Sequence, residues 1–300
     1  MLPDCQATAT VTPDLFIGVV TYPGTRFPDA SGPEGLATQI SRALAAAGLD
    51  TTIEFASENL YEESVFPIDR EAVKRSIEAE LNTEALWRAF LRSSRPSIKD
   101  RSVMTLRGHY RRRKYLPSNG KEITSSDPGS LMIRRLINIE LAHIGLLRSA
   151  VASGAAWTLI LEDDAEARDS DEFGKNLMAF IDRHQGKAQP SYVNISESFS
   201  SNSLGIEHLL HAVEPWNADD NACMLFSSDL PVTNTVCAIL YRKQFLRQLL
   251  DTMESIPIDP VIPIDWKLNQ ALMNLVQDGI IASGDSWITM PAPIVQRSML

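Results

Sequence analysis

Three adjacent carboxylates, Glu162, Asp163 and Asp164, follow the apolar run from Trp157 to Leu161 without a break. A short, continuously apolar run of this kind is typical of a central strand in a parallel sheet. Ligands of open α/β sheets bind beyond the carboxyl ends of such strands. Because adjacent carboxylates repel one another, holding them there is unfavourable unless a cation offsets their charge. Hard oxygen ligands in this position predict a site for Mg²⁺ or Mn²⁺ shared with substrate phosphates.

A helix cap is the plainer interpretation of these acids, because aspartates often begin helices. The helix that follows already has a capping box in Asp169 and Glu172, which weakens that interpretation. Side chains alternate along an extended segment, so Glu162 and Asp164 are expected to share one face of the strand and Asp163 the other. We therefore assign metal binding to Asp164 and Glu162, while Asp163 contacts the bound ligand or orients the loop.

Helices and strands alternate along the chain, which predicts an α/β fold with a Rossmann-like, mostly parallel sheet flanked by helices. Some antiparallel pairing is expected in the second half. Apolar and β-branched runs predict strands at 16–21, 52–56, 157–161, 192–195, 222–226, 235–241 and 280–289. Apolar positions recurring at three and four residues predict helices at 36–47, 69–91, 133–151 and 243–253, and another from about 265.

The chain has 300 residues, 44% of them hydrophobic, so a single domain over 1–300 with one large core is expected. No run approaches the roughly 18 consecutive apolar residues of a membrane span, and the amino-terminal residues lack the pattern of a signal peptide. The three cysteines have no CxxC spacing, which argues against a disulfide framework and a cysteine zinc site. These features predict a cytoplasmic protein.

Basic residues are concentrated in one part of an otherwise acidic chain. The formal net charge of −10 argues against a nucleic-acid partner. Between 88 and 121, however, basic residues are crowded together and Asp100 is the one acid. Because residues 94–129 are also rich in Pro, Ser and Gly, we expect a long, mobile insertion without regular structure. It is interpreted as a solvated loop, as a lid over the bound phosphates, or as a contact with anionic lipid at the inner face of the membrane.

Four short stretches resemble glycosyltransferase family 25, which includes lipooligosaccharide sugar transferases and collagen galactosyltransferases. Its members carry a helix with a Ser-His pair and then a strand ending in Leu-Glu-Asp-Asp, and residues 139–148 followed by 155–164 are similar to this arrangement. Gly24-Thr25-Arg26 resembles the arginine after the family's first strand. Residues 234–241, followed by Pro263-Ile264-Asp265-Trp266, resemble its late strand, helix and Pro-Val-Asp run. The resemblance implies a GT-A type fold, which is a Rossmann-like fold that binds nucleotide sugars.

The activity implied by the resemblance is transfer of a sugar from a nucleotide diphosphate sugar to a hydroxyl of a glycan or lipid-linked acceptor, with inversion. Asp164 would be the direct metal ligand, and Glu162 would bind the metal through water or contact the donor's ribose. A carboxylate must take the proton of the attacking hydroxyl, and the resemblance places Asp265 there. An aspartate at the start of a helix is equally suited to be an N-cap, so both interpretations of Asp265 stay open.

Donor contacts are expected from the neighbouring strand ends and from one helix. Thr21 ends the first strand, and Arg26 follows it with a guanidinium that suits phosphate oxygens, although an exposed arginine in a turn is nearly as good an interpretation. His143 matches the family's histidine, but a single histidine on an amphipathic helix is often structural. Asn194 is expected to face the site from the next strand.

Two other functions remain open on the sequence. Nucleotidyl transfer also uses acids at strand ends, a divalent metal and a diphosphate, although it normally brings a glycine-rich phosphate loop that residues 22–26 do not supply. A catalytically silent module that binds a nucleotide sugar or glycan is the second alternative. Release of free nucleoside diphosphate from a nucleotide sugar distinguishes a transferase from such a module.

Overall fold

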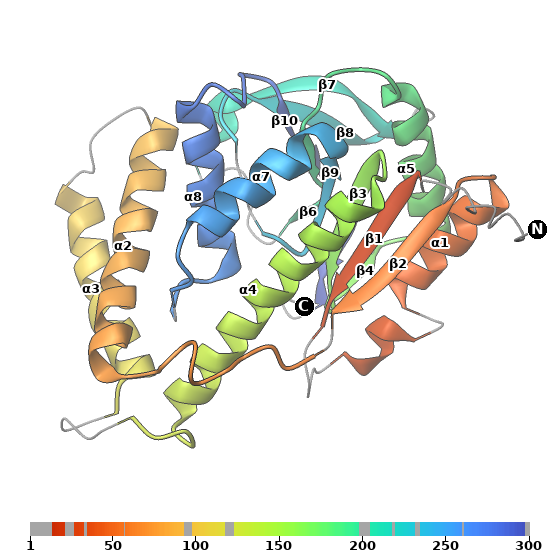
Figure 1. The fold of residues 1–300 in the computed structure, drawn as a ribbon. Coiled ribbons are helices and arrows are strands. Elements are labelled where there is room, and N and C mark those ends of the chain that lie inside the picture. Colours follow the sequence, from red (N-terminus) through yellow and green to blue (C-terminus); the bar gives the residue numbers. More distant parts are fainter. Residues whose placement is uncertain are drawn as a thin grey trace, which may run out of the picture.

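The structure is a computed structural model, and it describes residues 14–21, 27–32, 35–56, 58–92, 98–117, 123–197, 205–217, 220–231, 235–259 and 261–297. Within these residues, eight strands form one mixed sheet in the order β2-β1-β3-β9-β5-β10-β8-β7 (Figure 1). Their bounds are Leu15–Val20 (β1), Thr51–Ala56 (β2), Trp157–Glu162 (β3), Tyr192–Asn194 (β5), Leu210–Asn217 (β7), Asp220–Ser228 (β8), Ala238–Arg242 (β9) and Ser286–Met290 (β10).

The sheet changes from parallel to antiparallel pairing along its width. Strand β1 pairs in parallel with both β2 and β3, whereas β9 is antiparallel to β3 and to β5. Strands β5 and β10 are parallel, and β8 with β7 complete the sheet with antiparallel pairs. The expected α/β class, with antiparallel strands in the second half, is therefore confirmed at this level.

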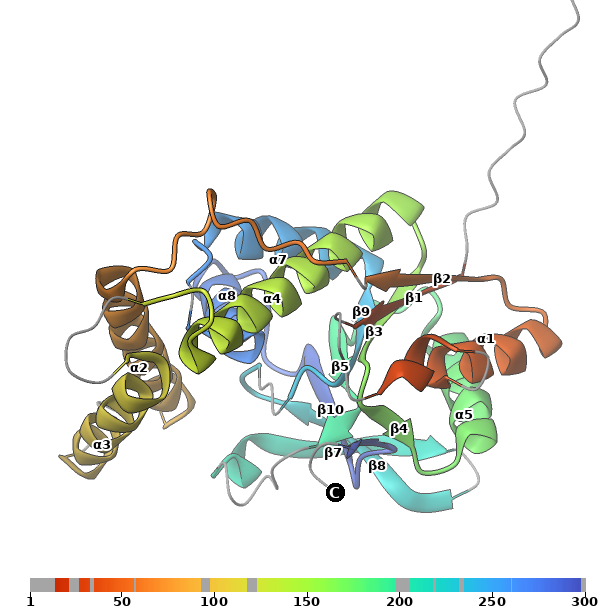
Figure 2. The same cartoon turned by 90° about the horizontal axis from the view of Figure 1, so that it is seen from below.

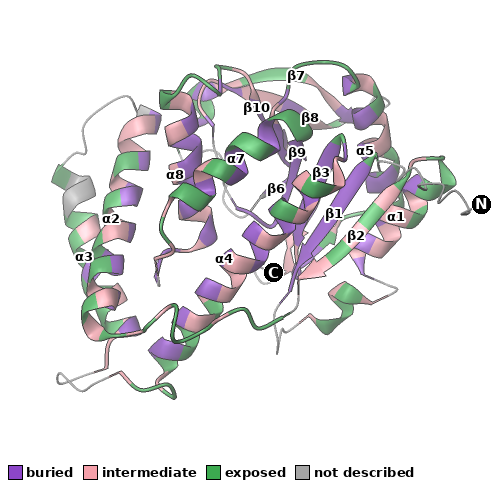
Figure 3. Ribbon diagram, viewed as in Figure 1, coloured by how far each residue is buried: buried purple, intermediate pink, exposed green. Residues whose placement is uncertain are grey.

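Helices cover both faces of the sheet (Figure 2). One face is covered by α4 (Pro128–Ser153), α7 (Lys243–Ser255) and α8 (Ile264–Gln277), and the other by α1 (Leu36–Ala46) and α5 (Ser170–His184). Side chains of β1 point alternately to the two faces of the sheet and contribute to the hydrophobic core on each. Phe16 and Val20 pack under α4, while Leu15, Ile17 and Val19 pack under α1 and α5. Both faces of the central strands are thus buried (Figure 3).

Gly18 permits a close approach between β1 and α4. A Cβ at this position would lie 2.8 Å from Cδ1 of Ile160 and 3.3 Å from Cβ of Leu146. The absence of a side chain lets α4 pack tightly on the strands that end at the acids. Gly48 and Gly154 follow the helices predicted at 36–47 and 133–151, and their φ angles are 86° and 74°. A positive φ is the conformation that glycine adopts without penalty after a helix, so both predicted ends are confirmed.

A three-stranded sheet lies beside the carboxyl ends of the central strands. It consists of β4 (Ala165–Ala167), β11 (Ile294–Gln296) and β6 (Ser196–Glu197), in the order β4-β11-β6. Strand β4 begins directly after the acids, and β11 pairs with it in antiparallel register. The backbone N–H of Arg297 donates to the carbonyl of Asp164 at 2.8 Å. The loop that carries the acids is therefore held on both sides by backbone hydrogen bonds.

The expectation of an irregular insertion at 94–129 is wrong over most of its length. Residues Ile98–Tyr115 form helix α3, which packs against α2 (Arg70–Arg92), and α4 begins at Pro128. Two arginines of α3 are matched by buried acids of α2, as Arg111 pairs with Glu80 and Arg107 with Glu84. These contacts explain the order, since both glutamates are buried and need a cation. Residues 93–97 and 118–122 lie outside the described part of the chain.

Helix α4 carries a buried ion pair close to the acids. By length and composition it is the one helix among the described residues that could cross a membrane, and its apolar side chains lie largely within the protein core. Glu140 of α4 pairs with Lys267 of α8, and both side chains are almost completely buried. Burial raises the pKa of Glu140 to about 6, although the ammonium of Lys267 acts in the opposite direction. The pair ties α4 to α8 beneath the candidate site.

Replacing Lys267 with methionine is expected to lower the free energy of unfolding by about 3 to 5 kcal/mol, because Glu140 would stay buried without its cation. Urea unfolding followed by circular dichroism measures the loss. Lys74→Met is the matched control, since it removes an exposed ion pair with Glu71 that should contribute less than about 1 kcal/mol. Equal losses in the two variants would contradict a structural role for the buried pair.

Candidate active site

The three acids lie where β3 ends, at the carboxyl edge of the parallel strands. The backbone N–H of Glu162 donates to the carbonyl of Cys237, which precedes β9, at 2.8 Å. Asp163 and Asp164 form a turn between β3 and β4, so the strand alternation does not continue beyond Glu162. Both aspartates are buried, with 8% and 6% of their surface exposed. Two buried carboxylates beside a third are electrostatically unfavourable unless a cation joins them.

Glu162 and Asp164 approach one another together with a residue that the sequence analysis did not single out. Their carboxylate oxygens and Sγ of Cys237 lie within 4.8 Å of each other. The thiol is 3.8 Å from Oδ1 of Asp164. Burial, followed by the charges of Glu162 and Asp164, raises the pKa of Cys237 well above its ordinary value, so the thiol is protonated at neutral pH. The two carboxylates offer hard oxygen ligands, which suit Mg²⁺ or Mn²⁺.

His143 connects α4 to the acids. Its ring is almost fully buried, and Nε2 lies 3.5 Å from Oε1 of Glu162. Apart from this contact, Nε2 has no hydrogen-bond partner in the described part of the chain. A buried polar atom without a full hydrogen bond is uncommon and calls for an explanation such as an absent ligand or ion. The structure thus places His143 against the predicted metal residues.

Asp265 lies in the first turn of α8 and lines a pocket together with the three acids. The N-cap position belongs to Pro263, and no side chain caps this helix. The N-cap interpretation of Asp265 is therefore wrong. Burial, helped by the negative charge of Glu162, raises the pKa of Asp265 to about 6, although its own backbone N–H and His143 act in the opposite direction. A carboxyl group with this pKa is largely ionised at neutral pH and is poised to accept a proton.

The three acids and Asp265 share one pocket of about 310 Å³. Asp265 and Ile264 of α8 form one wall, and the acids at the end of β3 form another. Helix α4 contributes Arg135, which brings a guanidinium to a pocket otherwise rich in carboxylates. The remaining lining residues are Val20, Phe27, Leu136, Ile139, Pro263 and Gln296. Opposite charges facing one pocket suit a ligand that carries both a metal ion and phosphate oxygens.

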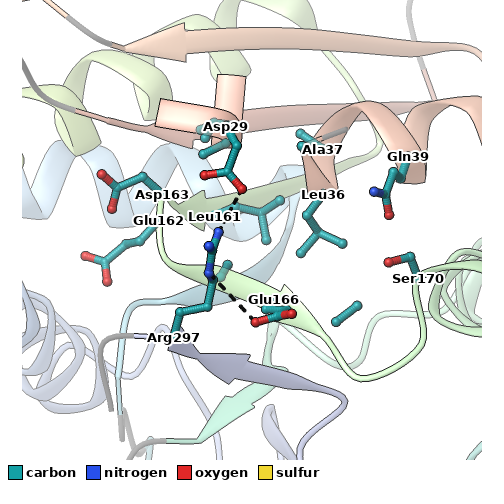
Figure 4. A pocket seen from close by; sticks show the side chains of 15 residues that line it. Asp29, Leu36, Ala37, Gln39, Leu161, Glu162, Asp163, Glu166, Ser170 and Arg297 are labelled. Atoms are coloured by element: carbon teal, nitrogen blue, oxygen red, sulfur yellow. Dashed lines mark hydrogen bonds and ion pairs between the residues drawn. The ribbon is translucent and has the colours of Figure 1, made fainter. Parts of the chain in front are cut away.

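A second pocket, of about 200 Å³, lies beside the same acids (Figure 4). Glu162 and Asp163 line both pockets, and in the close-up they project to the same side of the chain. Arg297 extends between Asp29, at 2.9 Å, and Glu166, at 3.8 Å. The start of α1 and Ser170, at the start of α5, form the far wall. The acid loop thus separates two cavities that could hold different parts of one extended ligand.

The other predicted contacts are placed differently. The side-chain amide of Asn194 donates to the carbonyl of Thr235 at 3.0 Å, and its oxygen accepts from the backbone and hydroxyl of Ser196. Asn194 therefore fixes the end of β5 against the segment that leads into β9. Thr21 donates its backbone N–H to Ala56 and is not among the described residues that line either pocket. Arg26 lies outside the described residues.

Sequence reasoning missed Cys237, Arg135 and Arg297. Cys237 had the best available signal, because it lies in an apolar run predicted to be a strand, but nothing in the run indicates that β9 pairs with β3. Arg135 is one of two adjacent arginines within the helix predicted at 133–151, and Arg297 follows the final extended segment.

No protein-family model matches this chain, and no curated protein matches it at a significant level. What the site can do is therefore inferred from its own side chains.

Proposed function

We propose that this protein is a metal-dependent glycosyltransferase of the GT-A type, which moves a sugar from a nucleotide diphosphate sugar to an acceptor hydroxyl with inversion. The observation that carries the proposal is the meeting, in one pocket, of the pair Glu162 and Asp164 with Asp265. The first two suit a divalent cation, and the third suits a general base. These residues come from distant parts of the chain, and all three lie in stretches that resemble glycosyltransferase family 25.

Glu162 and Asp164 are the residues that would hold Mn²⁺ or Mg²⁺. When bound, the ion stabilises the negative charge that develops on the departing diphosphate. The donor set fits such an ion, because two carboxylates lie together and the neighbouring thiol of Cys237 is protonated. His143 supports Glu162 from α4, and its Nε2 keeps that carboxylate on the side of the pocket. Arg135 faces the same space and is suited to phosphate oxygens.

Asp265 is assigned the proton of the acceptor. As the acceptor oxygen attacks the sugar's anomeric carbon, its proton moves to the Asp265 carboxylate and the bond to the diphosphate breaks. Direct displacement with one base requires the acceptor and the diphosphate to lie on opposite sides of the sugar. Asp265 on α8 and the acids at the end of β3 border the same pocket, as this arrangement needs.

The first experiment is a thermal-shift screen of uridine, guanosine and cytidine diphosphates, with and without Mn²⁺. One of the diphosphates is expected to raise the melting temperature when Mn²⁺ is present, because a ligand that binds only the folded state stabilises it by about 2.7 kcal/mol at 100 times its Kd. The corresponding monophosphate is the control and should give a smaller shift. No shift with any diphosphate in Mn²⁺ would count against a nucleotide-sugar enzyme.

A further inference from the structure

Helix α3 has a stripe of exposed apolar side chains outside the face that packs on α2. Val103, Leu106 and Tyr110 have 38%, 70% and 64% of their surface exposed. Residues spaced by three, four and seven positions lie on one face of a helix. The opposite face packs on α2, where a Cβ at Gly108 would lie 3.1 Å from Leu81. Exposed apolar residues grouped in this way mark a contact surface more often than scattered ones do.

Cationic side chains lie directly beside this stripe. An open depression of about 1200 Å³ lies between the start of α2 and the end of α3. Leu106 and Tyr110 line it, and none of the described residues that line it is a carboxylate, although Lys74 pairs with Glu71 beside it. Its cationic lining residues are Arg70, Lys74, Arg112 and Arg113. An apolar stripe flanked by such cations is the composition of helices that lie at a membrane surface.

The cations at this depression differ from the arginines that lie between α2 and α3, two helices that together form a helical hairpin. Arg107 and Arg111 are matched by buried glutamates of α2 and are committed to the fold. Arg112 pairs with Glu78 at 3.4 Å, but both side chains are about half exposed or more. Ion pairs of that kind contribute little, so such a cation can exchange its partner for a phosphate. Arg113 makes no ion pair with a carboxylate that the structure describes.

We propose that the outer face of α3, together with the start of α2, docks on an anionic membrane surface. Leu106 and Tyr110 would enter the boundary of the headgroups while the cations contact lipid phosphates. A nucleic acid would use the cations but leave the apolar stripe in water. A second copy of the chain, docked face to face, would bring two basic surfaces together. Anionic lipid satisfies both the apolar and the charged groups.

The docking surface lies on the same side of the molecule as the candidate active site. The start of α2 and the end of α3 lie toward the bottom of Figure 1, which is the direction in which β1 and β2 run. Figure 2, seen from below, shows this end of the hairpin beside the start of α4. Membrane docking would therefore hold the carboxyl edge of the sheet near the lipid surface. The docking itself does not depend on the reaction proposed above.

Co-sedimentation of the full chain with lipid vesicles tests the proposal. Binding is expected to vesicles that contain phosphatidylglycerol, to be much weaker with pure phosphatidylcholine, and to fall as salt rises. Arg113→Gln should weaken binding about fivefold, the equivalent of one basic residue at an anionic surface. Leu106→Glu should weaken binding roughly tenfold or more. It removes a leucine that would enter the lipid and adds a negative charge that the anionic surface repels.

Val213→Glu is the matched control. Val213 is also an exposed apolar residue, but it lies on β7, at the opposite edge of the sheet from β2. This variant should bind vesicles as the wild type does, and circular dichroism melts should show that all three variants are folded. Failure of the wild type to bind anionic vesicles at low salt would overturn the proposal. Equal vesicle binding by Leu106→Glu and the wild type would overturn it as well. So would binding of an oligonucleotide, or formation of a dimer, by a chain that does not bind vesicles.

Discussion

Asp164→Asn is expected to abolish transfer that depends on Mn²⁺, with a loss of about 10³-fold or more in kcat. A metal ion at a departing phosphate stabilises the transition state by several kcal/mol, and the substitution removes a charged ligand while keeping the size of the side chain. Asp164 is buried, and its carboxylate lies within 4.8 Å of the Glu162 carboxylate and the Cys237 thiol. Release of nucleoside diphosphate, measured over a range of Mn²⁺ concentrations, reports the loss.

Two companion variants separate a metal role from a general effect of lost charge. Asp171→Asn makes the same change at an exposed site in the first turn of α5 and should leave the rate unchanged. Asp163→Asn should reduce the rate less than Asp164→Asn, because Asp163 is not one of the three groups that converge within 4.8 Å. If Asp164→Asn turned over donor at the wild-type rate with the same Mn²⁺ dependence, the metal assignment would be wrong.

Asp265→Asn is expected to reduce kcat by about 10² to 10⁴-fold while changing KM little, as removal of a general base does. The asparagine keeps the shape and hydrogen-bonding ability of the side chain but cannot take a proton. Wild-type kcat/KM should rise with pH as Asp265, with a pKa of about 6, becomes ionised, and the residual activity of the variant should lack that rise. An unchanged pH profile in the variant would assign the base to another residue.

The same variant is expected to be more stable than the wild type at neutral pH, by up to about 3 kcal/mol. The pKa of Asp265 is raised from 3.8 to about 6 in the folded protein, so the folded state disfavours the charged form. This penalty is fully present above about pH 6 and disappears as the pH falls toward 3.8, where both folded and unfolded chains are protonated. Thermal melts of both proteins across this range measure the difference. A variant that is less stable at every pH would contradict an unfavourable carboxylate.

The central strands were predictable because each one is a continuous apolar run, which indicates a strand buried on both faces. In β3 the apolar run continues to Leu161, directly before Glu162, and both faces of the strand are covered. Helix α3 could not be recognised in the same way. Its packed face contains Gly108 and Arg111, and the stabilising partners of its arginines lie on another helix. Charge pairing between elements leaves no apolar period for sequence reasoning to detect.

The candidate site was predictable only in part for a related reason. The acids after β3 identify themselves by their position at the end of an apolar run. Their meeting with Cys237 depends on β9, which inserts between β3 and β5 in antiparallel orientation. Nothing local in a sequence specifies which strand becomes the neighbour of another. The contact of Asp265 with the same pocket likewise requires α8 to pack across the sheet, which follows from long-range packing alone.

Because β4 pairs with β11, the acid loop can reach its final geometry only after the last strand of the chain has been made. Asp164 receives a backbone hydrogen bond from Arg297, and Ala165–Ala167 pairs with Ile294–Gln296, a segment that is synthesised much later. Domains are made from the amino terminus onward, and contacts between distant segments form late. While the chain is still being synthesised, the acid loop lacks the neighbour that holds its backbone. A ribosome-bound chain that ends before β11 is therefore expected to contain the metal-binding side chains without their final geometry.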